Sequence, residues 1–183
     1  VAFVACSASV AADRTRPAAG GARKIVLIGG GKSEGAGRHD YPNAIRVHAR
    51  LLKSSPELPG LDIDTHPDGW PADAALDRAS TVVLYFDGLD KHPLLSTERR
   101  EHFEAAMRAG VGLVVLHQAS TVPATDRTVD LQRWLGGARY GMFDRATEMA
   151  EVAPATPAHP VGRGLAPCSS ARQISVGALL PWA

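Results

Sequence analysis

Three runs of apolar and β-branched residues constrain the fold of this chain more than any other feature. They occupy residues 25–28, 81–86 and 111–116, and each is followed at once by glycine, aspartate or histidine. Runs of this length and composition are typical of strands that are buried on both faces of a parallel sheet. The chain is therefore expected to contain a buried sheet whose strands end in polar loops.

Helix signals lie between these runs. Asp40 can cap a helix that has Pro42 in its first turn and stops at residues 54–56, and a second helix is expected from Ser96 to Ala109, closed by Gly110. The other expected elements are a short strand at 61–65, a short helix at 72–79 and a helix that opens at Asp126 or Thr128, contains Leu131, Trp134 and Leu135, and ends at 136–137. Strands that alternate with helices predict an α/β fold, a doubly wound, mainly parallel sheet with helices on both faces.

The composition is that of one globular domain. The chain has 183 residues, of which 45% are hydrophobic and 21% are charged. Lys and Arg number 20 against 19 Asp and Glu, which gives a net charge of +1. This balance excludes a protein that binds nucleic acid through bulk positive charge.

The first residues have the character of a targeting segment. Val1 to Ala12 is apolar and is followed by Asp13 and Arg14, but it is shorter than the about 20 residues that span a bilayer. It matches the hydrophobic and cleavage regions of a secretory signal without the positive leading region. We expect export to the periplasm or the medium, with a lipid anchor if residues 3–6 are a lipoprotein box. If residues 1–12 are not a signal, the protein is cytoplasmic. No integral membrane segment is expected.

Polar residues directly after the strands mark the expected site. Doubly wound sheets bind ligands beyond the carboxyl ends of their strands, which selects residues 29–39, 87–92 and 117–118. His117 follows its strand directly, at a strand-to-helix turn where related enzymes display a nucleophile. Because this position has no Ser or Cys, an imidazole acting as a general base or metal ligand is favoured over an acyl-enzyme.

The glycine-rich loop at 29–31 does not fit either nucleotide motif. Lys32 and Ser33 resemble the end of a phosphate-binding loop, but the required earlier glycine would fall on Val26, inside the strand. In the dinucleotide pattern, Glu34 stands where the last glycine is needed. Nucleotide binding is therefore not expected.

Six segments match, in order and spacing, a family that is already known. They are His39-Asp40-Tyr41 after the glycine-rich loop, Gly69-Trp70-Pro71, the strand before Asp87-Gly88 with His92-Pro93, residues 110–117, Trp134 to Gly137, and His159 to Leu165. From about Lys24 to Leu165 the chain resembles the ThuA-like (trehalose utilisation) family, whose fold is related to class I glutamine amidotransferases. The resemblance implies a flavodoxin-like sheet in which His117 occupies the position of the amidotransferase cysteine. It also implies a role in carbohydrate utilisation, and not glutamine hydrolysis.

The chain departs from the family in two places. Relatives carry an acidic residue near Thr121 and a further His after the double glycine, whereas residues 140–146 contain no His. After Leu165 the family continues into an aromatic segment with an Asp-Glu pair, which is missing here. The expected divisions are a signal remnant (1–12), a flexible lead-in (13–23), a ThuA-like domain (24–167) and an atypical tail (168–183) that indicates a truncation or frameshift. A missing outer strand would leave the edge of the sheet uncovered.

The leading hypothesis is a hydrolase that acts on trehalose or a related sugar. Its catalytic residues would be His117, His39 and Asp87. Its substrate-binding residues would be His92, His159, Gly30, Gln118 and Trp70. Trp70 has an equally good alternative role as a packed loop anchor, while Trp134 is expected in the core.

Three alternatives stay open at this stage. His39, His117 and His159 could instead hold a divalent metal such as zinc, which would activate a water molecule. The domain could bind a sugar or a partner protein without catalysis, or it could be an inactive, truncated copy. The expected partner is a small-molecule carbohydrate, and a homo-oligomer is compatible with the sequence.

Overall fold

The computed structural model describes residues 23–35, 38–123, 129–135, 139–140, 144–153 and 166–176. The predicted signal at 1–12, nearly all of the lead-in, the double glycine at 136–137 and the segment that contains His159 lie outside the described residues. Residues 177–183 of the atypical tail lie outside them as well.

Four parallel strands form the central sheet. They are β1 (Lys24–Gly29), β2 (Asp62–His66), β3 (Ala79–Tyr85) and β4 (Gly112–Val115), in the order β2-β1-β3-β4. Lys24 to Ile28 of β1 pair in register with Asp62 to His66 of β2, and Thr81 to Leu84 of β3 pair with Gly112 to Val115 of β4. The three apolar runs are thus three of the four strands, and the predicted doubly wound sheet is confirmed.

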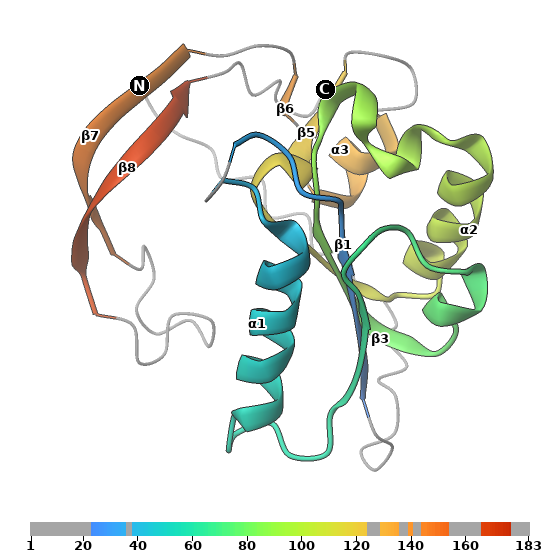
Figure 1. Cartoon of the computed structure of the whole chain (residues 1–183). Coiled ribbons are helices and arrows are strands. Elements are labelled where there is room, and N and C mark those ends of the chain that lie inside the picture. The colour runs from blue at the N-terminus through green and yellow to red at the C-terminus, as the bar shows by residue number, and fades with distance from the viewer. Residues whose placement is uncertain are drawn as a thin grey trace, which may run out of the picture.

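Two helices cover opposite faces of this sheet, α1 (Tyr41–Ser54) on one and α2 (Thr97–Arg108) on the other (Figure 1). The side chain of Asp40 accepts a hydrogen bond from the backbone N–H of Asn43 and so caps α1, as the sequence predicts. Gly110 ends α2 with a φ of +83°. Ser96 stands at the N-cap of α2, but its side chain makes no capping hydrogen bond there.

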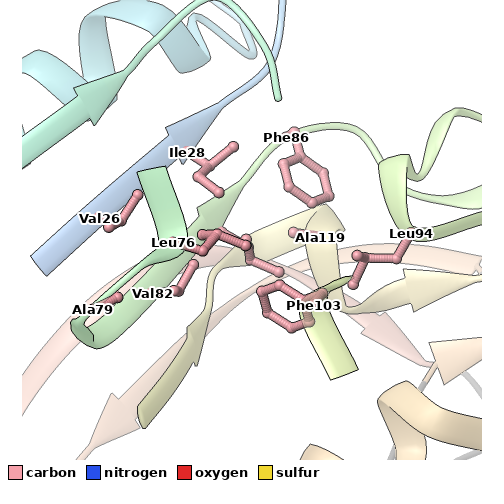
Figure 2. Packing of buried hydrophobic residues seen from close by; sticks show 10 residues of the cluster. Val26, Ile28, Leu76, Ala79, Val82, Phe86, Leu94, Phe103 and Ala119 are labelled. Carbon is pink, nitrogen blue, oxygen red and sulfur yellow. The ribbon is translucent and has the colours of Figure 1, made fainter. Parts of the chain in front are cut away.

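Successive residues of β1 and β3 point into two separate cores. Val26 and Val82 pack with Phe103 of α2 in the larger core, and Figure 2 shows these side chains converging with Phe86 and Leu94. On the other face, apolar residues of the sheet pack against α1 in a smaller cluster whose buried members are Leu27, Ile45, Ala49 and Val83. This alternation is the reason that residues 25–28 of β1 and 82–85 of β3 are apolar at successive positions.

Several further elements complete the described chain. They are the single-turn 3-10 helices η1 (Asp73–Leu76), η2 (Leu89–Lys91), η3 (Pro93–Leu95) and η4 (His117–Ser120), the helix α3 (Val129–Leu135), and the strands β5 (Thr121–Val122), β6 (Arg139–Tyr140), β7 (Asp144–Val152) and β8 (Cys168–Val176). The short helix expected at 72–79 is reduced to η1, since β3 already begins at Ala79.

An antiparallel hairpin of β7 and β8 stands apart from the parallel sheet in Figure 1. The sequence predicts no strand in either segment, and residues 168–183 are expected to form an atypical tail. The structure instead pairs Asp144 with Val176 and Val152 with Cys168 at the two ends of a continuous ladder. Both segments are rich in charged and small residues, so they lack the apolar runs from which the other strands were predicted.

Candidate functional site

The loops after β1, β3 and β4 place five polar or aromatic side chains in contact beyond the carboxyl ends of these strands. Ser33 and His39 come from the loop after β1, Tyr41 begins α1, Asp87 follows β3, and His117 follows β4. In the order β2-β1-β3-β4 the chain reverses direction across the sheet between β1 and β3. Ligands of open α/β sheets bind at such a switch point.

Asp87 is the centre of the hydrogen bonds in this cluster. Its Oδ1 atom accepts from the hydroxyl of Ser33 at 2.9 Å and from the hydroxyl of Tyr41 at 2.8 Å. Nδ1 of His39 lies 3.1 Å from the same Ser33 hydroxyl and 3.7 Å from Asp87 Oδ1. The side chains of His39 and Asp87 are only 14% and 18% exposed, so these contacts are largely shielded from water.

Four side-chain rings contact one another beside these hydrogen bonds. The rings of His39 and His117 meet edge to face, with centroids 5.1 Å apart and planes at 81°. Tyr41 lies 5.4 Å from His39 and 5.0 Å from Tyr85, whose ring is 6.3 Å from that of His117. The two imidazoles and the two tyrosine rings therefore form one cluster of rings in contact.

The backbone is strained at this site. His117 has a φ of 55°, His39 of 43° and Glu34 of 58°, all in the left-handed region that residues with a side chain rarely adopt. Leu89, two residues after Asp87, has a φ of 55°. Such conformations cost about 1–3 kcal/mol each and gather at functional sites, where the surrounding structure holds them. Four of the five such residues in the described chain belong to the three site loops; the fifth is Arg78.

Burial and Asp87 together fix the state of Tyr41. Burial raises the pKa of the Tyr41 phenol well above its usual value of 10, and the hydrogen bond to Asp87 raises it further. The hydroxyl therefore stays protonated and remains a donor to Asp87. This contact ties the start of α1 to the end of β3.

Charged side chains lie at the rim of the cluster. Lys91 Nζ is 3.6 Å from the second carboxylate oxygen of Asp87, but Lys91 is mostly exposed, so this pair contributes little. Glu34 Oε1 is 3.6 Å from His39 Nδ1. Nδ1 of His39 thus faces three oxygen atoms, those of Ser33, Glu34 and Asp87.

Two glycines let the site loops pack closely. A Cβ atom on Gly88 would collide with the backbone carbonyl oxygens of Gln118 and Thr121. A Cβ on Gly30 would lie 2.7 Å from Cβ of Phe86. Gly30 and Gln118, both predicted to bind substrate, therefore have a packing role that the structure describes, while their contact with substrate stays a prediction.

Two other predicted site residues lie apart from the cluster. His92, expected at the rim, is 3% exposed; its Nε2 lies 3.0 Å from the carbonyl of Ala119, and its Nδ1 accepts from the N–H of Leu94. Burial lowers the pKa of His92 to about 4, so the ring is neutral and structural. Trp70 packs against Phe103 with centroids 5.8 Å apart, which fits its alternative role as an anchor.

Sequence reasoning did not assign a role to Ser33, Tyr41 or Tyr85. Tyr41 appeared only as part of a matching segment, and Ser33 only as the end of a failed nucleotide motif. The usable signal was their place in loops that meet at one edge of the sheet.

The metal hypothesis stays a prediction. Across the described ranges, no group of three His, Cys, Asp or Glu side chains is arranged to hold a metal ion. His159, the third proposed ligand, lies outside those ranges. In the same part of the chain, no helix has the length and apolar character to cross a membrane.

The strand order and the location of the site define an α/β protein of the flavodoxin-like class. Its fold is ThuA-like. The structure is similar to the 2.30 Å crystal structure of a protein from Bacteroides uniformis described as ThuA-like, with a TM-score of 0.61 at 18% sequence identity. The likeness covers 85% of this chain and 61% of the other, so this chain spans less than two thirds of that protein. No protein-family model and no curated protein matches the sequence.

Proposed function

We propose that the protein hydrolyses a carbohydrate, with His117 as the general base and with His39 and Asp87 orienting the hydroxyl groups of the sugar. The observation that carries this proposal is the pair of imidazoles held at strained backbone positions beside a carboxylate. Strained backbone positions gather at functional sites, and the left-handed conformations of His39 and His117 therefore support a functional role for both.

The chemistry of the cluster supports a sugar as the substrate class. A sugar presents hydroxyl groups, which imidazole nitrogens and carboxylates bind, and C–H faces, which pack on aromatic rings. Asp87, His39 and His117 supply the polar groups, and Tyr41 and Tyr85 supply aromatic surface beside them. In the proposed reaction His117 accepts a proton from the attacking water molecule, the water oxygen bonds to the anomeric carbon as the glycosidic C–O bond breaks, and the departing oxygen takes up a proton from solvent.

Release of monosaccharide from a panel of disaccharides that includes trehalose tests this function. His117→Ala is expected to abolish detectable turnover, since a general base contributes roughly 10²–10⁴-fold. His39→Ala, which loses an orienting group, is expected to lower turnover at least about tenfold. His102→Ala is the matched control, because His102 lies on α2, partly exposed, and bonds to the carbonyl of Asp73. Full activity of His117→Ala would overturn the assignment. Sugar binding without turnover in the wild-type protein would favour a binding domain instead.

A further inference from the structure

We infer that Ser33 is a positioning residue that fixes the proton of His39 on Nδ1 and leaves Nε2 as an acceptor. One part of the inference rests on the proposed function, namely that Nε2 accepts a hydrogen bond from a hydroxyl group of the substrate. The position of the proton follows from the hydrogen bonds alone.

The hydroxyl group of Ser33 carries a single hydrogen. This hydroxyl donates to Asp87 Oδ1 at 2.9 Å, and a carboxylate can only accept. Ser33 Oγ has then no hydrogen left for His39, whose Nδ1 lies 3.1 Å away. The hydrogen between Ser33 and His39 must therefore belong to Nδ1.

The surroundings of Nδ1 favour the same tautomer. Glu34 Oε1 at 3.6 Å and Asp87 Oδ1 at 3.7 Å both turn negative charge toward this nitrogen. Both oxygens are beyond hydrogen-bond distance, so Ser33 supplies the acceptor that Nδ1–H contacts directly. A neutral imidazole carries one hydrogen, so Nε2 keeps a lone pair.

The loop also holds Ser33 and His39 in fixed positions. The backbone N–H of Ser33 donates to the carbonyl of His39 at 3.3 Å, and the left-handed Glu34 turns the chain between them. Tyr41 donates to the same Asp87 oxygen and so fixes the acceptor at the end of the chain of hydrogen bonds. In this arrangement His39 donates to Ser33 and Ser33 donates to Asp87, so both hydrogen bonds run in the same direction.

The tautomer can be measured by nitrogen-15 NMR of the imidazole rings in the intact chain at pH 8, without substrate. Free histidine prefers the hydrogen on Nε2, so a His39 with its hydrogen on Nδ1 is distinctive. We expect the wild-type protein to show a pyrrole-like Nδ1 and a pyridine-like Nε2 at His39. The opposite assignment would overturn the inference.

Variants of Ser33 separate positioning from folding. Ser33→Ala is expected to shift His39 toward the Nε2–H tautomer, and Ser33→Thr, which keeps the hydroxyl, to restore Nδ1–H. Ser54→Ala is the control, since that exposed hydroxyl on α1 bonds only to the carbonyl of Leu51. An unchanged tautomer in a folded Ser33→Ala protein would contradict the role of Ser33. Should Ser33→Ala not fold, a wild-type-like tautomer in Asp87→Ala, which removes the acceptor and frees the Ser33 hydroxyl hydrogen for His39, would contradict it equally.

Kinetics distinguish this inference from the proposed function. On an active sugar, Ser33→Ala is expected to raise KM about tenfold, the effect of losing one substrate hydrogen bond of about 1.4 kcal/mol. If the tautomers behave as expected but no sugar is hydrolysed, the proposed function fails while the role of Ser33 stands.

Discussion

Acid is expected to destabilise this protein through one buried ring, that of His92. In the unfolded chain a histidine titrates near pH 6.5, whereas burial lowers the pKa of His92 to about 4 in the fold. Below pH 6.5 the unfolded chain therefore takes up a proton that the folded chain refuses. The contribution of the neutral ring to the free energy of unfolding is complete above pH 6.5 and is lost as the pH falls to about 4.

The magnitude follows from these two pKa values. Each pH unit within the window is worth about 1.4 kcal/mol, so His92 alone should lower the free energy of unfolding by about 2 kcal/mol between pH 7 and pH 5. This is a large share of the stability of a small domain. The ring cannot escape the penalty by rotating, because both nitrogens are bonded, to Ala119 and to Leu94.

Urea unfolding at pH 7, 6 and 5 measures the effect. His92→Asn is expected to be less stable than wild type at pH 7, because it loses buried hydrogen bonds, but to lose about 2 kcal/mol less on going to pH 5. His102→Gln, a change at a partly exposed histidine on α2, is the control for the loss of a histidine outside the core. Equal pH slopes in His92→Asn and wild type would refute the reasoning, since the carboxylates that also titrate are the same in both.

Two further predictions concern packing. Gly88→Ala forces a Cβ against the backbone carbonyls of Gln118 and Thr121, so it should cost about 1–3 kcal/mol and perturb the NMR signals of the site histidines. Gly31→Ala, where an added Cβ meets no atom within 4 Å, should stay within about 1 kcal/mol. Equal stability of the two variants would contradict the close approach at Gly88. Phe103→Ala removes a fully buried ring and should lower the free energy of unfolding by about 3–5 kcal/mol, measured by denaturation. Phe103→Leu should lower it by less than half as much. A loss below about 1 kcal/mol in Phe103→Ala would show that the ring is not at the core.

The sheet could be predicted from sequence because its signals are local. Residues 25–28 and 81–86 are apolar at successive positions since both faces of the strand are covered, and Asp40 and Pro42 mark the start of α1 within three residues. The same reasoning could not detect β7 and β8, because neither strand has a continuous apolar run. Their pairing depends on contact between residues that are 16 positions apart at Val152 and Cys168 and 32 apart at Asp144 and Val176.

The sequence predicts where the site lies, but not the contacts between its side chains. Sheet topology places the loops after β1, β3 and β4 at one edge, and this brought His39, Asp87 and His117 into the hypothesis. The Ser33 hydroxyl bridges to Asp87 across 54 residues, and no sequence spacing encodes such a bond. The buried contacts of His92 were not predictable for the same reason, since its ring lies against the carbonyl of Ala119, 27 residues further along.

Because the strands are parallel, the loops at their carboxyl ends and the loops at their amino ends lie at opposite ends of the sheet. All the loops that meet at the site follow the carboxyl ends of strands, whereas the connection from α1 to β2, residues 55–61, lies at the amino ends. Gly60 in that connection has a φ of +72° and open space around it. A fluorophore or affinity tag inserted there would report on the protein from the side opposite its chemistry, which makes this turn the natural attachment point for biosensor engineering.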